Sequence, residues 1–157
     1  MKKDFGLYLE YLGRERFRSI IIHNDKLGSL SQFAVMSAKA FKGKYINLIE
    51  YFKNHSELAQ SIDTFSFQDL FILLQNESQG ESLLIVDNAN FLLDTWQRNK
   101  REAFHRMVKN QWDSYKDSMK TILVFCLHSS EEIVNLKTLD SQGNERINPL
   151  SSFKSID

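Results

Sequence analysis

Three uninterrupted apolar runs constrain this chain more than any other feature of its sequence. They occupy residues 19–22, 82–86 and 121–127, and each is apolar apart from a leading serine or threonine. A strand that is buried on one face alternates apolar and polar residues, whereas a strand that is buried on both faces is apolar throughout. The runs therefore predict a parallel sheet with helices covering both of its faces.

Segments with helical spacing separate these runs. Helices or helical turns are expected at residues 5–12, from Ser29 or Ser31 to about 43, and at 55–62, 66–76, 89–96, 97–115 and 131–136. Further strands are expected at residues 45–49 and 144–150, the second of them an edge strand closed by Pro149. Residues 1–157 are thus predicted to form a single P-loop NTPase-like α/β domain, a three-layer sandwich around a mostly parallel sheet of about five strands.

The composition is that of an ordinary globular protein, with 42% hydrophobic and 25% charged residues. No apolar run approaches the length that spans a bilayer, and the amino terminus lacks the apolar core of a signal peptide. The single cysteine, Cys126, excludes an intrachain disulfide. A cytoplasmic protein without a membrane contact is therefore expected.

Charge is unevenly distributed along the chain, although the formal net charge is zero. Residues 48–95 carry eight acidic side chains and one basic one, whereas residues 97–120 carry seven basic and three acidic ones. The zero net charge argues against a dedicated nucleic-acid binder, because phosphate neutralisation dominates that affinity. The asymmetry suits binding to another protein or head-to-tail self-association, and solvated helix faces that differ in sign are the alternative.

The stretch that follows the first apolar run lies where nucleotide-binding α/β proteins place a phosphate-binding loop. That loop reads G-x-x-x-x-G-K-[ST], in which glycines let backbone N–H groups close on phosphate and the lysine contacts the β/γ-phosphates. On this template His23 replaces the first glycine, Gly28 keeps the second and Ser29 replaces the lysine. Asn24 and Lys26 lie inside the loop, and the Lys26 ammonium could approach a phosphate from another side. An ordinary strand-to-helix turn is the alternative.

A carboxylate ends the second apolar run. Asp87 follows four apolar residues, which is the position where P-loop NTPases place the aspartate that helps to hold Mg²⁺. Many ATPases place a glutamate next, to activate the attacking water, but here Asn88 carries an amide that cannot take a proton. An aspartate that caps the following turn explains the pattern equally well.

These features together resemble the core of an AAA-type P-loop ATPase. In that family the strand corresponding to residues 121–127 ends in a polar residue that senses the γ-phosphate, and the resemblance gives this place to His128 or Ser129. The stretches 86–94 and 143–150 are similar to the small P-loop subunit of type-3 BREX bacteriophage-exclusion systems. The resemblance implies a P-loop fold, a bacterial source and a part in antiviral defence.

The missing lysine changes what that resemblance implies for activity. We expect the nucleotide-binding set to be degenerate, with no catalytic residue and no dependence on ATP or Mg²⁺ as a cofactor. Its members would be Asn24, Lys26, Gly28, Ser29, Asp87 and His128. No His or Cys spacing matches a zinc site, so no metal centre is expected.

Two other constellations are candidates for function. His23 and His128 end strands that should be neighbours, so they could converge at the sheet edge, with satisfied strand ends as the alternative. A second group could form an interaction surface on or near the helix at 97–115: Arg98, Arg101, His105 and Lys109, with the aromatic anchors Trp96 and Trp112. A core position is the favoured alternative for both tryptophans.

Three functional hypotheses follow. The preferred one is a non-catalytic subunit of a bacterial multi-protein system, which binds protein partners or itself. The second is a nucleotide-binding ATPase with an atypical loop. The third is an accessory protein that contacts nucleic acid weakly through the face formed by Arg98, Arg101, His105 and Lys109.

Overall fold

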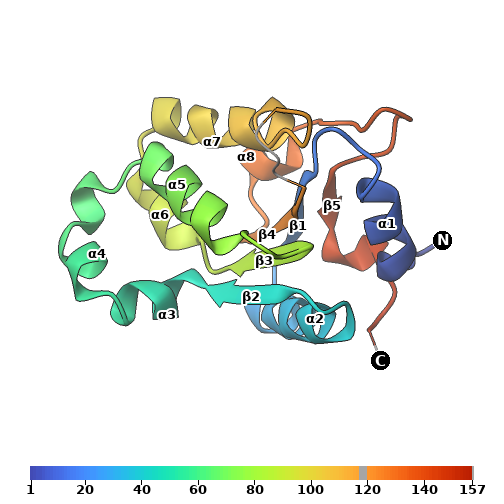
Figure 1. The fold of residues 1–157 in the computed structure, drawn as a ribbon, viewed down its shortest axis with the longest axis horizontal. Helices are drawn as coiled ribbons and strands as arrows, with labels where there is room; N and C mark the ends of the chain where they lie inside the picture. The colour runs from blue at the N-terminus through green and yellow to red at the C-terminus, as the bar shows by residue number, and fades with distance from the viewer. Residues whose placement is uncertain (117–119, 157) are drawn as a thin grey trace.

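The computed structural model describes residues 1–116 and 120–156, and its strands form one five-stranded sheet (Figure 1). The strands are β1 (Ser19–Asn24), β2 (Lys44–Asn47), β3 (Leu83–Asp87), β4 (Ile122–His128) and β5 (Ile147–Pro149). Their order across the sheet is β2-β3-β4-β1-β5, and every neighbouring pair is parallel. The predicted α/β sandwich around a parallel sheet is therefore confirmed.

The three central strands are apolar because helices cover both of their faces. β3 is buried along its whole length, and β1 and β4 are buried except for their last residues, half-buried Asn24 and exposed His128. β5 is an edge strand that ends at Pro149, as the sequence predicted, but it begins at Ile147 rather than at residue 144 and is only three residues long. Proline lacks the N–H that would extend the hydrogen-bond ladder, so the sheet stops there.

One face of the sheet is covered by α1 (Phe5–Leu12), α2 (Leu27–Ala40) and the short 3₁₀ helix η2 (Leu150–Ser152). The buried cluster on this face includes Phe5, Leu9, Ile20, Ile22, Leu30, Phe33, Ala34, Val124 and Phe153. α2 begins two residues before the predicted start at Ser29. The reason is that extended Lys26 is the N-cap, and its carbonyl accepts the N–H of Leu30 at 3.3 Å.

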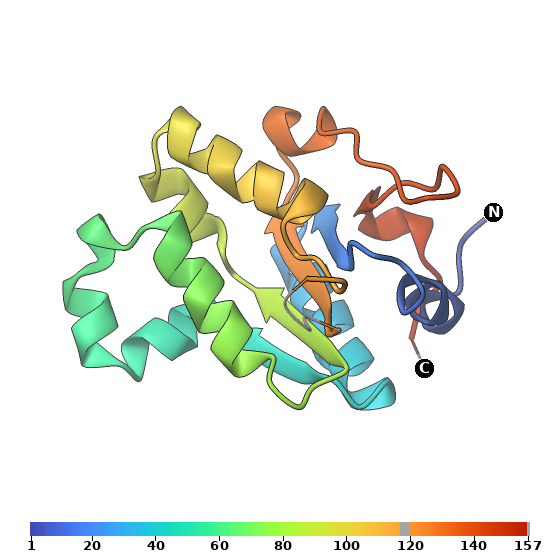
Figure 2. The ribbon, with the colours of Figure 1, turned by 45° about the horizontal axis from the view of Figure 1, so that its top comes forward.

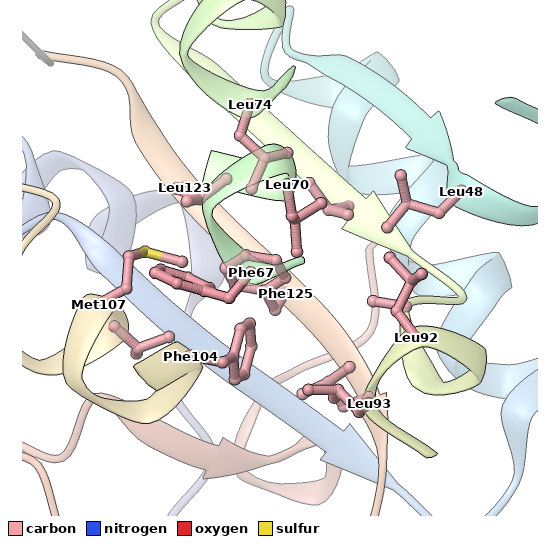
Figure 3. Packing of buried hydrophobic residues seen from close by; sticks show 14 of the residues in the cluster. Leu48, Phe67, Leu70, Leu74, Leu92, Leu93, Phe104, Met107, Leu123 and Phe125 are labelled. Carbon is pink, nitrogen blue, oxygen red and sulfur yellow. The ribbon is translucent and has the colours of Figure 1, made fainter. Parts of the chain in front are cut away.

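The opposite face is covered mainly by three helices, which lie on the near side of the sheet in Figure 2, with α2 behind it. These are α5 (Phe67–Glu77), α6 (Asn90–Thr95) and α7 (Arg98–Asn110). Their side chains meet Leu123 and Phe125 of β4 in the larger buried cluster (Figure 3). The predicted capping box of α5 is present: Ser66 Oγ accepts the N–H of Asp69, and the Asp69 carboxylate accepts the N–H of Ser66.

Shorter elements complete this side of the molecule. They are α3 (Leu48–Lys53), α4 (Ser56–Gln60), the 3₁₀ helix η1 (Ile62–Thr64) and α8 (Glu131–Val134). β2 ends at Asn47, earlier than the predicted strand, because the Asn47 side chain accepts N–H groups of the next turn and starts α3. No helix in the described ranges is both long and apolar enough to cross a bilayer.

α7 ends at Asn110, whereas the apolar spacing predicted a helix as far as Tyr115. The chain turns after α7 and carries Trp112 into the core, where its indole N–H donates to the Thr121 carbonyl at 2.8 Å. The Asp113 carboxylate then accepts hydrogen bonds from Nε and Nη2 of Arg16. The apolar spacing therefore continues into the non-helical segment after Asn110. Burial of Trp112 and the Arg16–Asp113 ion pair hold this segment, and they replace the hydrogen bonds of a helix.

A buried arginine ties the amino edge of the sheet together. Arg146 is 2% exposed, and its guanidinium donates to the carbonyls of Ser19 at 3.0 Å, Lys109 at 2.9 Å and Val108. Burial lowers the pKa of this guanidinium. Because the carbonyls of Val108 and Lys109 lie in the last turn of α7, the positive charge faces the negative end of that helix. Arg146 thus links the starts of β1 and β5 to the end of α7.

The connections leave neighbouring strands β1 and β4 toward opposite faces. β1 leads into α2, whose residues pack in the smaller cluster, whereas β4 leads into α8, whose Ile133 packs in the larger one. Ligands of open α/β sheets bind outside the carboxyl ends of the strands at such a reversal. The fold therefore directs attention to the carboxyl ends of β1 and β4.

Candidate functional site

Three predicted site residues lie at the carboxyl edge of the sheet because three neighbouring strands end there. Asn24 ends β1, Asp87 ends β3 and His128 ends β4. Asn24 is in register with His128, and Asp87 with Cys126 of the same strand. The sheet thus brings together the strand ends that the sequence proposed as a nucleotide site, and the side-chain contacts show what each one does.

The connection from β1 to α2 is a tight two-residue turn formed by Asp25 and Lys26. The Asn24 side-chain amide donates to the Lys26 carbonyl at 3.0 Å, and the Asn24 carbonyl accepts the N–H of Ser129 at 3.0 Å. Both Gly28 and Ser29 already belong to α2, and a Cβ on Gly28 would meet no atom within 4 Å. The turn therefore closes on itself, and its geometry matches the strand-to-helix alternative rather than a glycine-built phosphate cradle.

Asp87 is held inside the protein by two donors. The carboxylate is 2% exposed, one oxygen accepts the Tyr45 hydroxyl at 2.7 Å, and the other accepts the N–H of Asn88 at 2.9 Å. Burial, then the hydrogen bond to Asp87 and then the Asp87 charge raise the pKa of Tyr45, so that hydroxyl remains a donor. Asn88 has a φ of 60°, a conformation that asparagine tolerates well. Asp87 therefore ties β3 to β2 and caps the turn after it.

His23 and His128 do not converge as the sequence suggested. His23 is in register with Leu127, one position away from His128, and alternate positions along a strand point to opposite faces. His23 is 7% exposed, and its Nδ1 lies 2.8 Å from the Ser129 hydroxyl. Burial lowers the pKa of His23, although the Asp25 charge opposes this shift. The alternative interpretation, a satisfied histidine at a strand end, describes His23.

His128 instead lines a cleft of about 480 Å³ at the carboxyl edge, together with two residues from the predicted basic face of α7. Its lining residues are Leu27, Asn90, Leu93, Asp94, Arg101, His105, His128, Ser130, Glu132 and Ile133. The Asn90 side chain accepts the backbone N–H of His128 at 3.0 Å. The cleft therefore joins Arg101, His105 and His128, which the sequence had assigned to two separate sites.

The basic face of α7 is partly neutralised within the chain. Arg101 pairs with Glu132 of α8 at 3.0 Å and donates to the Trp96 carbonyl at 2.6 Å. Arg98 lies 3.8 Å from Glu102, and Lys109 is exposed. Burial lowers the pKa of His105, so its imidazole is neutral near pH 7. This face therefore offers less free positive charge than its sequence suggested.

Both tryptophans belong to the core, so their proposed role as interface anchors is wrong and the alternative is confirmed. Trp96 is 4% exposed and Trp112 is fully buried. Each indole N–H has a backbone acceptor inside the protein, the Phe65 carbonyl for Trp96 and the Thr121 carbonyl for Trp112, both at 2.8 Å. A buried indole needs such an acceptor, which explains why both rings turn inward.

Sequence reasoning missed Tyr45, the residue that decides what Asp87 does. Tyr45 was predicted only as part of a strand, and no local motif connects it with a residue 42 positions later. The role of Asn90 was missed for the same reason. Within residues 1–116 and 120–156, no group of three or more His, Cys, Asp or Glu side chains could hold a metal ion.

The comparisons with known proteins add no assignment to this geometry. No protein-family model matches the chain, and no curated protein matches its sequence.

Proposed function

We propose that this chain is a non-catalytic protein with a P-loop-like fold, which acts by assembling with other proteins. The observation that carries the proposal is the state of Asp87. Both of its oxygens accept hydrogen bonds from the chain itself, and its side chain is almost fully buried. A carboxylate that helps to hold Mg²⁺ in an ATPase faces the nucleotide, whereas this one faces the Tyr45 hydroxyl and the backbone of Asn88.

The turn between β1 and α2 supports the same proposal. Ser29 stands at the position of the phosphate-binding lysine, and the two-residue turn before α2 is closed by the Asn24 amide. Lys26 is the extended N-cap of α2 and is exposed at the surface. A working loop of this kind surrounds the phosphates with several backbone N–H groups, which this turn does not provide.

The part in assembly rests on the resemblance and on charge. The resemblance to the small P-loop subunit of type-3 BREX systems makes a bacterial antiviral complex the proposed setting. The acidic region 48–95 includes α3, α4 and α5, and α3 and α4 lie at one end of the molecule (Figure 1). Complementary charge directs association with a basic partner surface.

The catalytic half of the proposal is tested by calorimetric titration of Mg·ATP into the protein and into Asp87→Ala. We expect no binding stronger than about 1 mM in either case, because the loop lacks its lysine and its N–H cradle. Micromolar binding that the Asp87→Ala change abolishes would establish the alternative, an ATPase with an atypical loop.

The assembly half is tested by co-expression with the products of the neighbouring genes, followed by mass measurement of the purified species. A stable complex of defined stoichiometry is the expected result. A monomer that shifts labelled DNA or RNA at physiological salt, and loses the shift in Arg98→Ala/Arg101→Ala, would favour the nucleic-acid alternative instead.

A further inference from the structure

A second cleft, of about 400 Å³, lies between the first two turns of α2 and the segment that follows β5. It is lined by Lys2, Asn24, Ser29, Gln32, Phe33, Met36, Leu150, Ser151, Phe153, Lys154, Ser155 and Ile156. Asp25, Lys26, Asp87 and His128 are not among these residues. The cleft is therefore separate from the cleft beside α7, and it shares only Asn24 and Ser29 with the predicted nucleotide site.

The charged side chains among the described residues that line this cleft are all basic. Two lysines, Lys2 and Lys154, line it, and none of its described lining residues is acidic. The other polar side chains on its rim are neutral hydroxyls and amides, including Ser29, Ser151 and Ser155. Because a pair of ammonium groups attracts anions, the rim favours a negatively charged group.

The floor of the cleft is apolar and aromatic. Phe33 and Phe153 are 8% and 3% exposed, and their rings lie 6.1 Å apart. Met36, Leu150 and Ile156 are half-buried beside them. An apolar floor under a cationic rim fits a ligand that carries an anionic group on an apolar or aromatic body.

The wall that carries the two lysines is held in place by backbone pairing of the two chain ends, which lie on the same side of the molecule (Figure 1). The Lys3 N–H donates to the Ser152 carbonyl at 2.7 Å, and the Lys154 N–H donates to the Lys3 carbonyl at 2.8 Å. Phe153 also packs against Phe5, with ring centroids 5.2 Å apart. The backbone of Lys154, and that of Lys3 beside Lys2, is thus fixed before any ligand binds, which lowers the entropy cost of binding.

We propose that this cleft binds a phosphate monoester carried on an apolar or aromatic group, with Lys2 and Lys154 on the phosphate and Phe33 and Met36 against the body. Two ammonium groups match the roughly two negative charges of a phosphate monoester near pH 7. The site is distinct from the one discussed above, because Asp25, Lys26 and Asp87 do not line it.

The probe is 1-naphthyl phosphate, titrated at low salt and followed by its fluorescence, with 1-naphthol and inorganic phosphate as separate arms. We expect 1-naphthyl phosphate to bind at least about tenfold more tightly than either fragment, because only the intact molecule reaches both the rim and the floor. Equal binding of 1-naphthol would show a merely apolar surface and overturn the proposal, as would no binding of the ester.

Matched lysine variants locate the site. Lys2→Gln/Lys154→Gln should weaken binding of the ester about tenfold or more and leave 1-naphthol unchanged, since both side chains are exposed and removed from the core. Lys39→Gln removes the same kind of charge from α2 outside the cleft and should have no effect. An equal loss in Lys39→Gln, or full affinity in the double variant, contradicts the assignment to this cleft.

Discussion

The two edges of the sheet are built differently, although the same strands form both. At the amino edge, polar groups are bonded across the fold: buried Arg146 reaches three backbone carbonyls, and exposed Arg16 pairs with buried Asp113. At the carboxyl edge, the turn at Asp25 is exposed and a charged cleft opens beside α7. The amino edge therefore fixes the fold, while the carboxyl edge remains available for ligands or partners.

The comparison is tested most strongly by Arg146→Met. The change leaves the carbonyls of Ser19, Val108 and Lys109 without their donor, so we expect a loss of about 3 kcal/mol in the free energy of unfolding. Chemical denaturation measures it. Arg106→Met in α7 is the matched control, because Arg106 is exposed, and it should change the stability by less than about 0.5 kcal/mol. Equal effects of the two changes would contradict the conclusion that the buried contacts of Arg146 at the amino edge stabilise the fold.

Two glycines offer a smaller test of the same difference. At the amino edge, a Cβ on Gly43 would lie 2.8 Å from the buried side chain of Leu83, so Gly43→Ala should cost about 1–2 kcal/mol. At the carboxyl edge, Gly28 is helical and open, so Gly28→Ala should stabilise the protein by about 0.5 kcal/mol. The melting temperatures of both variants show whether each change stabilises or destabilises the protein. A destabilising Gly28→Ala would mean that the loop needs its glycine, as a phosphate-binding loop does.

The smallest expected effect is a pH dependence at the carboxyl edge. Because burial lowers the pKa of His23, the unfolded chain binds a proton more readily than the folded one as the pH falls below about 6.5. The contribution of neutral His23 to the free energy of unfolding is therefore fully present above pH 6.5. It declines as the pH falls toward the pKa of His23 in the folded protein. His23→Gln should flatten the fall in melting temperature between pH 7.5 and pH 5. An unchanged slope in this variant would show that His23 is not held neutral by the fold. Burial also lowers the pKa of His105, so part of the slope should remain.

The sheet could be predicted from the sequence because its information is local. Continuous apolar runs identify strands that are buried on both faces, and the capping pattern at Ser66 identifies the start of α5. Helix ends were less predictable. The apolar residues that continue past Asn110 keep helical spacing, but the helix ends there and Trp112 enters the core from a turn. This turn is held by hydrogen bonds to Thr121 and Arg16, which are distant in the sequence and cannot be identified from spacing.

The candidate site was less predictable than the fold, because its chemistry depends on contacts between distant residues. The Asp87 pattern fits a metal ligand and a turn cap equally well, and Tyr45, 42 positions away, decides between them. Arg101 has the spacing of a basic face, yet Glu132 on another helix pairs with it. Sequence spacing placed Asp87 at the end of a strand and Arg101 on the face of a helix, but it could not reveal the partners of either residue.

The most direct test of the account is the coupling energy between Tyr45 and Asp87. It is obtained from the unfolding free energies of the protein, Tyr45→Phe, Asp87→Asn and the double variant, each measured with and without Mg·ATP. We expect a coupling of about 1–2 kcal/mol that Mg·ATP leaves unchanged, because Asp87 is a structural acceptor. A coupling near zero, or one that disappears when Mg·ATP is added, would contradict this account and return Asp87 to the role of a metal ligand.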